Sequence, residues 1–128
     1  MTAPLFAGIG GHHSPRSKTD EWLTPPSILS ALGGWQSFGL DPCAPIARPW
    51  PTARHHYTVE DNGLLLSWRG FGRIWLNPPY STEALRCWLA RMAAHDHGTA
   101  LIFARTETAT FFDHVWASAA AVLFVKGR

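Results

Sequence analysis

The chain has 128 residues and a formal charge of +2, and 46% of its residues are hydrophobic. This length supplies one hydrophobic core, so we expect a single globular domain and exclude a disordered chain. The slight excess of positive charge permits a nucleic-acid partner without requiring one. No apolar run approaches the roughly 20 residues that cross a membrane, so we expect no membrane association.

Cysteine and histidine usage predicts neither a disulfide framework nor a metal site. The two cysteines, Cys43 and Cys87, resemble no secreted disulfide pattern, and the first residues resemble no signal peptide. We therefore expect a reduced, cytoplasmic setting. The seven histidines match no zinc-ligand spacing, and no cysteine pair accompanies them. We accordingly predict no bound metal.

The beginning of the chain divides into an arm and a first helix. Residues 1–20 are rich in Gly, Pro, Ser and His without periodicity, which predicts a flexible arm before a domain of residues 21–128. Thr24 is a favourable helix N-cap, and Pro25 is favourable at the first helical position. The predicted helix ends at the glycine pair 33–34. Capping accounts for Thr24 by itself, and it is compatible with a place beside a cofactor.

An acidic residue follows each of the next two predicted extended segments. Residues 38–44 predict a short strand with Asp41 near its end, where a carboxylate suits a cationic or hydroxyl-bearing cofactor group. Asp41 is equally explained as a turn-initiating residue before Pro42. Residues 55–59 predict a second extended segment, and Asp61 after it is either an acceptor for an adenine amino group or an ordinary turn acid. No glycine-rich fingerprint accompanies them, so a dinucleotide cofactor is not supported.

Two stretches around these segments lack strand character. Residues 44–54 contain three prolines and no periodicity, so we predict a loop. Asn62 and Gly63 signal a turn, and the apolar residues 64–68 then predict one or two helical turns.

The most informative stretch follows residues 74–76, whose apolar side chains predict a buried strand. Asn77, Pro78, Pro79 and Tyr80 come next, and the prolines end the strand because neither donates a backbone hydrogen bond. The Asn77 side-chain oxygen and the Pro78 carbonyl are two acceptors that suit an amino group with two hydrogens. The Tyr80 ring offers a face for a planar base, so an exocyclic amine of a nucleobase satisfies both demands. The same residues also describe an ordinary strand-ending turn with a packed tyrosine.

The rest of the chain alternates between helix and strand. The predicted elements are a helix capped by Ser81, a strand at 99–104, a helix at 110–118 with Thr108 as its cap, and a strand at 121–125. This alternation predicts an α/β fold with a mainly parallel sheet and helices on both faces. Parallel strands end at one rim, so Asp41, Asn77 and Arg105 are expected on the same rim. An arginine there suits a phosphate or a cofactor carboxylate, and a surface ion pair explains it equally well.

Six short segments occur in a fixed order with close spacing. They are Trp22–Pro25, Leu40–Ala44, Asp61–Leu64 followed by Trp68, Trp75–Ser81, Ala104–Thr106 and Lys126–Arg128. This order resembles the phage-type DNA N6-adenine methyltransferases, a family of small S-adenosylmethionine-dependent enzymes of phages and prophages. The resemblance covers roughly residues 20–128. Each motif alone is weak, because Asn-Pro-Pro-Tyr also occurs in protein-glutamine methyltransferases, but the ordered set is specific.

The resemblance implies a Rossmann-like methyltransferase fold and assigns roles to individual residues. The motif that binds a flipped adenine is matched by Asn77, Pro78, Pro79 and Tyr80. The segments that line the cofactor pocket are matched by Thr24, Pro25, Asp41, Pro42, Ala44 and Asp61. Arg105 matches a recurring arginine to which we assign a DNA contact.

The same resemblance implies the reaction, the partner and the setting. The partner is double-stranded DNA, from which the target adenine leaves the stack. The adenine N6 then attacks the methyl group of S-adenosylmethionine, with Asn77 and the Pro78 carbonyl holding the N6 hydrogens. Positioning supplies most of the rate, without a metal or a covalent intermediate. The implied setting is the cytoplasm of a bacterial host, with a phage or prophage gene.

Two other functions fit parts of the pattern. Chains of this family usually continue past the Lys-Gly-Arg segment with more strand, so we expect a C-terminally shortened fold. One alternative is therefore an inactive relative that binds cofactor or DNA without catalysis. The other is a protein-glutamine methyltransferase, which the central turn permits and the residues around Asp41 and Asp61 disfavour. No motif indicates the DNA target sequence or an oligomeric state.

Overall fold

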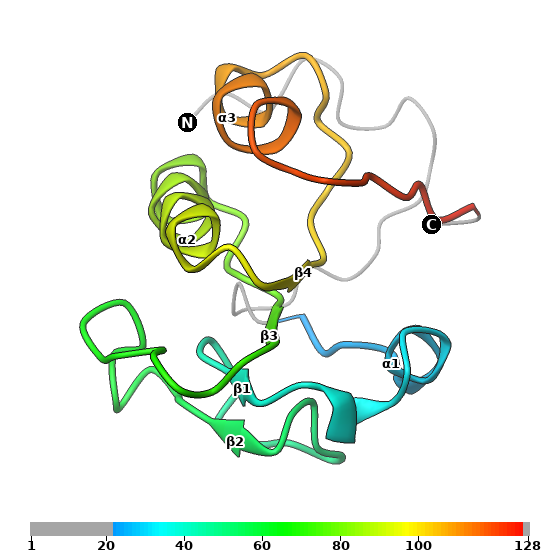
Figure 1. Cartoon of the computed structure of the whole chain (residues 1–128), viewed down its shortest axis with the longest axis vertical. Coiled ribbons are helices and arrows are strands. Elements are labelled where there is room, and N and C mark those ends of the chain that lie inside the picture. Colours follow the sequence, from blue (N-terminus) through cyan, green and yellow to red (C-terminus); the bar gives the residue numbers. More distant parts are fainter. Residues whose placement is uncertain (1–21, 127–128) are drawn as a thin grey trace, which may run out of the picture.

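A four-stranded parallel sheet forms the centre of the molecule (Figure 1). The structure, a computed structural model, describes residues 22–126. The order of the strands across the sheet is β2 (His55–His56), β1 (Leu40–Asp41), β3 (Ile74–Leu76) and β4 (Gly98–Ala100). Leu40 lies opposite both His55 and Ile74, and Ile74 lies opposite Gly98. All three strand pairs are parallel, which confirms the predicted α/β architecture.

Helical segments connect and cover these strands. In chain order they are α1 (Pro26–Ala31), the 3-10 turn η1 (Trp35–Ser37), α2 (Thr82–His95), α3 (Ala109–Phe111) and the π-helical turn η2 (Phe112–Trp116). Ser81 occupies the N-cap position of α2 as predicted, although its side chain makes no capping hydrogen bond. Thr108 caps α3 as predicted, because its Oγ1 accepts a hydrogen bond from the Phe111 amide at 3.3 Å.

The side chains of β3 divide the core between the two faces of the sheet, because successive residues of a strand point in opposite directions. Ile74 and Leu76 pack on the same face as Trp88 of α2. Trp75 packs on the other face with Leu29 of α1. Figure 1 shows α1 and α2 on opposite sides of the strands. The expectation of helices on both faces is therefore confirmed.

The first helix begins later than predicted. Pro25 occupies its N-cap position and Pro26 its first helical position, so Thr24 is not the cap. The Thr24 hydroxyl instead accepts hydrogen bonds from Trp75 Nε1 at 2.9 Å and from Asn77 Nδ2 at 3.2 Å. The Thr24 hydroxyl thus accepts from two side chains that are distant in sequence, in place of the backbone N–H of the first helical turn that a cap would bind.

Residues 64–68 contain a turn and a bend but no helix, so the predicted helical turns are wrong. The reason is a tertiary partner for the backbone. The guanidinium of Arg91 donates hydrogen bonds to the carbonyls of Leu64 and Leu66, each at 2.7 Å. The Trp68 indole donates to the Gly63 carbonyl at 2.8 Å. These carbonyls are therefore satisfied without a helical ladder.

The end of the described chain also departs from its prediction. The predicted helix at 110–118 is α-helical only over Ala109–Phe111 and continues as η2. Residues 121–125 form no strand, and Leu123 is 81% exposed. Val122 alone of these residues packs against a core cluster of the described chain, beside Phe111 and Val115. Residues 121–125 therefore form no ladder of strand hydrogen bonds, because no neighbouring strand within residues 22–126 pairs with them. Their composition alone favours a strand.

The predicted flexible arm, residues 1–20, lies outside the described residues. Within residues 22–126, no helix is both long and apolar enough to span a bilayer.

Candidate functional site

A cavity of about 270 Å³ lies at the carboxyl ends of β1 and β3. Its walls come from the segments that follow three strands and from two tryptophans. The lining residues are Pro42, Cys43, Ala44 and Pro45 after β1, Thr58, Val59, Asn62 and Gly63 after β2, Asn77 and Pro79 after β3, and Trp22 and Trp88. Open α/β sheets bind their ligands at this rim, and the volume approaches the roughly 300–1,000 Å³ of small-molecule sites.

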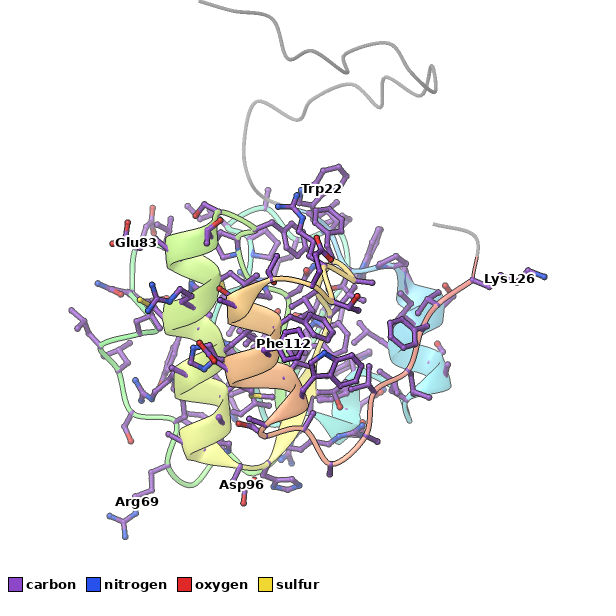
Figure 2. All side chains as sticks on the ribbon, turned by 90° about the horizontal axis from the view of Figure 1, so that it is seen from above. Trp22, Arg69, Glu83, Asp96, Phe112 and Lys126 are labelled. Carbon is purple, nitrogen blue, oxygen red and sulfur yellow. The ribbon has the colours of Figure 1, made fainter. Side chains whose placement is uncertain are left out.

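Figure 2 shows which end of the molecule this rim occupies. Trp22, which lines the cavity, lies at one end, and Arg69 and Asp96 lie at the opposite end. Asp96 precedes β4, so that end is the amino rim of the sheet.

Asn77 stands directly after β3, and its side chain is held at both ends. Nδ2 donates to the Trp22 carbonyl at 2.6 Å and to Thr24 Oγ1 at 3.2 Å. Oδ1 accepts a hydrogen bond from the Tyr80 hydroxyl at 2.8 Å. An amide oxygen has two lone pairs, so one remains for a further donor. Asn77 is therefore an oriented acceptor on the cavity wall.

The Tyr80 ring stacks on Phe103, with the ring centres 4.1 Å apart and the planes 28° apart. Phe103 in turn meets Trp22 edge-on at 6.2 Å. Trp22 and Phe103 are 41% and 44% exposed, so this aromatic cluster faces solvent beside the cavity. Phe103 therefore covers one face of the Tyr80 ring, which was predicted to stack on a base.

Asp41 lies beneath the wall formed by Pro42 and Ala44. It is only 1% exposed, and its Oδ1 accepts a hydrogen bond from the Cys43 amide at 3.1 Å. Its Oδ2 accepts a short hydrogen bond from the Thr52 hydroxyl. Burial raises the pKa of this carboxyl to about 6, although the bonds from Thr52 and Cys43 oppose the shift. Asp41 therefore holds the loop after β1 and does not line the cavity.

His56 supports the same loop from the neighbouring strand. It pairs with Asp41 in the parallel register, and its Nε2 accepts a hydrogen bond from the Thr52 amide at 3.2 Å. Burial lowers the pKa of His56, and the nearby charges of Arg48 and His55 lower it further. A neutral ring is the form that accepts this bond.

Asp61 is exposed and organises the turn after β2. Its Oδ2 accepts hydrogen bonds from the amide and the hydroxyl of Thr58, at 2.8 and 3.3 Å. Asn62 then adopts a left-handed conformation with φ 57°. At Gly63 an added Cβ would lie 1.9 Å from the Pro42 carbonyl oxygen. Only glycine permits this approach, which brings two walls of the cavity together.

The remaining predicted site residues lie around this centre. Thr24 and Pro78 are buried, and Pro25 is half-buried at the start of α1. Arg105 is exposed, and its guanidinium carbon lies 5.7 Å from the centre of the Phe103 ring. Among residues 22–126, no three His, Cys, Asp or Glu side chains come close enough to share a metal ion.

The structure thus brings Pro42, Ala44, Asn77 and Pro79 together on one cavity. The other predicted site residues support its walls or stand beside them. Trp88 of α2 lines the cavity as well as packing in the core, and no site role was predicted for it. Seven further lining residues carried no predicted binding role. Four of them belong to the motifs of the sequence analysis, namely Trp22, Cys43, Asn62 and Gly63, and the other three are Pro45, Thr58 and Val59. Their only sequence signal is proximity to a motif.

The molecule is therefore an α/β protein with a ligand-sized cavity at the carboxyl ends of β1 and β3. An oriented amide acceptor, Asn77, lines this cavity. Comparison with known proteins specifies the class of this molecule further. The family model described as DNA N-6-adenine-methyltransferase (Dam) matches residues 11–128. The chain belongs to this family.

One curated relative adds to this result. The DNA N-6-adenine-methyltransferase of Escherichia phage T1 is 24% identical to the chain over 118 residues. The alignment covers 91% of this chain and 49% of the phage protein, so the chain spans about half the length of that relative. No solved structure is significantly similar to the chain.

Proposed function

We propose that the chain transfers a methyl group from S-adenosylmethionine to N6 of adenine within a specific site of double-stranded DNA. The observation that carries the proposal is the shared cavity. Its walls combine Pro42 and Ala44, which match the cofactor segment, with Asn77 and Pro79, which match the adenine motif. Family membership supports the same reaction.

The residues of the cavity fit the proposed cofactor chemically. Apolar groups on Pro42, Ala44, Val59 and Trp88 suit an adenosyl ring and methylene groups, and Thr58 and Asn62 add polar groups. S-adenosylmethionine supplies an electrophilic methyl group when it is bound. We assign its binding to the segments that follow β1 and β2, with Asp41 and Asp61 holding these segments in place.

The residues after β3 would position the base. The second lone pair of Asn77 Oδ1 accepts one hydrogen of an adenine amino group, as the Pro78 carbonyl would accept the other. Tyr80, whose hydroxyl bonds to Asn77 Oδ1, is the candidate ring for stacking on the base. Fixed acceptors and a fixed ring hold the amine in a single orientation, which is how positioning raises a rate.

DNA would approach the exposed surface around the cavity. Trp22 and Phe103 present aromatic rings there, and Arg105 adds a positive charge next to Phe103. Aromatic rings beside a guanidinium suit bases and phosphates together. We therefore retain Arg105 as a DNA contact.

Radiolabelled methyl transfer tests the proposal. The chain is incubated with labelled S-adenosylmethionine and two duplexes of equal length, one of mixed sequence and one made only of G and C. Label is expected in the first duplex alone, because the second has no adenine. Calorimetry without DNA measures cofactor binding separately. Cofactor binding without transfer would indicate the inactive relative, and label in added protein would indicate a protein methyltransferase; either result contradicts the proposal.

A further inference from the structure

The Asn77 amide has its nitrogen fully occupied within the protein. An amide nitrogen carries two hydrogens, and the structure gives each an acceptor, the Trp22 carbonyl at 2.6 Å and Thr24 Oγ1 at 3.2 Å. The reversed orientation would place the amide oxygen against the Trp22 carbonyl, which is an acceptor only. The orientation with the oxygen towards Tyr80 is therefore the favoured one.

Thr24 supports this orientation by accepting the second amide hydrogen, and it is itself held from two sides. Its carbonyl accepts a hydrogen bond from Trp50 Nε1 at 2.8 Å, and its hydroxyl accepts one from Trp75 Nε1 at 2.9 Å. Thr24 is only 3% exposed, so water does not substitute for these partners. The segment before α1 is thus held by the Trp75 indole of β3 and by the Trp50 indole of the loop after β1, at the point where it contacts Asn77.

We infer that Thr24 is a positioning residue that, together with the Trp22 carbonyl, makes Asn77 an acceptor only, so that the site selects bases with an exocyclic amino group over bases with an oxo group there. This inference rests on the proposed function and deepens it. A freely rotating amide would present either its oxygen or its NH₂ to a ligand, whereas this amide presents only its oxygen. The role differs from the direct cofactor contact that the motif implied for Thr24.

The test compares three forms of the full chain. Thr24→Val removes the hydroxyl and would leave the Trp75 indole without a partner, so the reference form carries Trp75→Phe. The second form carries Trp75→Phe and Thr24→Val, and the third carries Trp75→Phe and Thr24→Ser. Single substitutions Thr24→Val and Thr24→Ser repeat the comparison with Trp75 intact.

The first measurement does not depend on activity. The chain has two asparagines, Asn62 and Asn77, so labelling with ¹⁵N-asparagine gives two side-chain NH₂ groups. The exposed Asn62 serves as an internal control. Adding Thr24→Val to the reference form is expected to speed hydrogen exchange of the Asn77 NH₂ by about tenfold, because one of its bonds is lost, while Thr24→Ser leaves it nearly unchanged. Equal exchange in the valine and reference forms would overturn the inference, whether or not the proposed reaction occurs.

The second measurement separates positioning from cofactor binding. At saturating S-adenosylmethionine, the valine form is expected to lose about tenfold in kcat relative to the reference form, with cofactor Kd changed less than about twofold and with recovery in the serine form. A weaker cofactor Kd with an unchanged kcat would show that Thr24 contacts the cofactor instead. Absence of transfer in the unsubstituted chain would refute the proposed function, and the exchange measurement would still decide the role of Thr24.

Discussion

Asn77 illustrates how much a single residue depends on contacts that its motif does not contain. The Asn-Pro-Pro-Tyr sequence indicates an acceptor at the end of a strand, and the structure places Asn77 there. Its orientation, however, depends on Trp22 and Thr24, which precede it by 55 and 53 positions. Tyr80 is likewise fixed by Phe103, which follows it along the chain. The sequence therefore predicts the type of group at the site but not the partners that orient it.

Asp41 makes stability depend on pH. Its folded-state pKa, raised from 3.8 to about 6, means that the folded protein holds this proton more tightly than the unfolded chain does. Its contribution to stability is therefore fully present below pH 3.8 and decreases as pH rises to about 6. Asp41→Asn keeps both hydrogen bonds, with its oxygen accepting from Cys43 and its nitrogen donating to Thr52, and it removes this titration.

The expected result is that Asp41→Asn gains roughly 2 kcal/mol of stability relative to the unsubstituted protein between pH 4 and pH 7, because part of the effect is already present at pH 4. Urea unfolding at both pH values measures this difference. A stability difference that is the same at pH 4 and pH 7 would show that burial does not raise the pKa of this carboxyl in the folded protein.

Arg105 is predicted to contact a DNA phosphate. Arg105→Ala should weaken DNA binding at low salt and reduce the slope of log K against log salt by about one, because one counterion fewer is released. Arg69→Ala is the matched control, since Arg69 is also exposed but lies at the opposite end of the molecule (Figure 2). Binding measured by fluorescence anisotropy at several salt concentrations gives both slopes. Equal slopes for the two variants would remove Arg105 from the interface.

At the scale of elements, prediction succeeded where a segment is determined by its own side chains. The apolar residues 74–76 gave β3 with its bounds, and Thr108 capped α3. Prediction failed where a distant residue supplies the hydrogen bonds. Arg91 binds the carbonyls of Leu64 and Leu66 in place of a helical ladder, and local composition carries no trace of this contact.

Residues 121–125 show the converse failure. Their composition favours a strand, but a strand requires a partner edge as well as β-favouring side chains. Within the described chain β4 is the last strand of the sheet, and Leu123 is 81% exposed. Residue composition alone therefore predicted a strand, although no neighbouring strand of the described chain pairs with these residues.

The close approach at Gly63 gives a prediction for the cavity walls. Gly63→Ala should destabilise the fold by roughly 1–3 kcal/mol, because its Cβ would overlap the Pro42 carbonyl, and should weaken cofactor binding by moving the loop after β1. Gly39→Ala is the matched control, since its Cβ would lie 1.6 Å from the Phe71 carbonyl oxygen and Gly39 does not line the cavity. Calorimetry below both melting transitions compares the affinities. Affinity losses of equal size would mean that Gly63 acts only through general stability.

Across the whole molecule, the parallel sheet explains why separate motifs converge. The segments after β1 and β3 are far apart in sequence, but their strands are neighbours and run the same way. Their ends therefore meet at one rim, as the alternation of helices and strands predicted. The cavity itself was not predictable, because its shape depends on Trp22, Trp88 and the tight contact at Gly63.

We propose that this rim binds a methyl donor and presents the amino group of adenine to it through Asn77. Mass spectrometry of nucleosides from DNA treated with the chain and S-adenosylmethionine tests it most directly. We predict that N6-methyladenine accumulates with the unsubstituted protein, and that Asn77→Ala reduces its rate of formation by roughly 100-fold or more while cofactor affinity changes little. A methyl group on another atom, or the same rate from Asn77→Ala, would contradict the account.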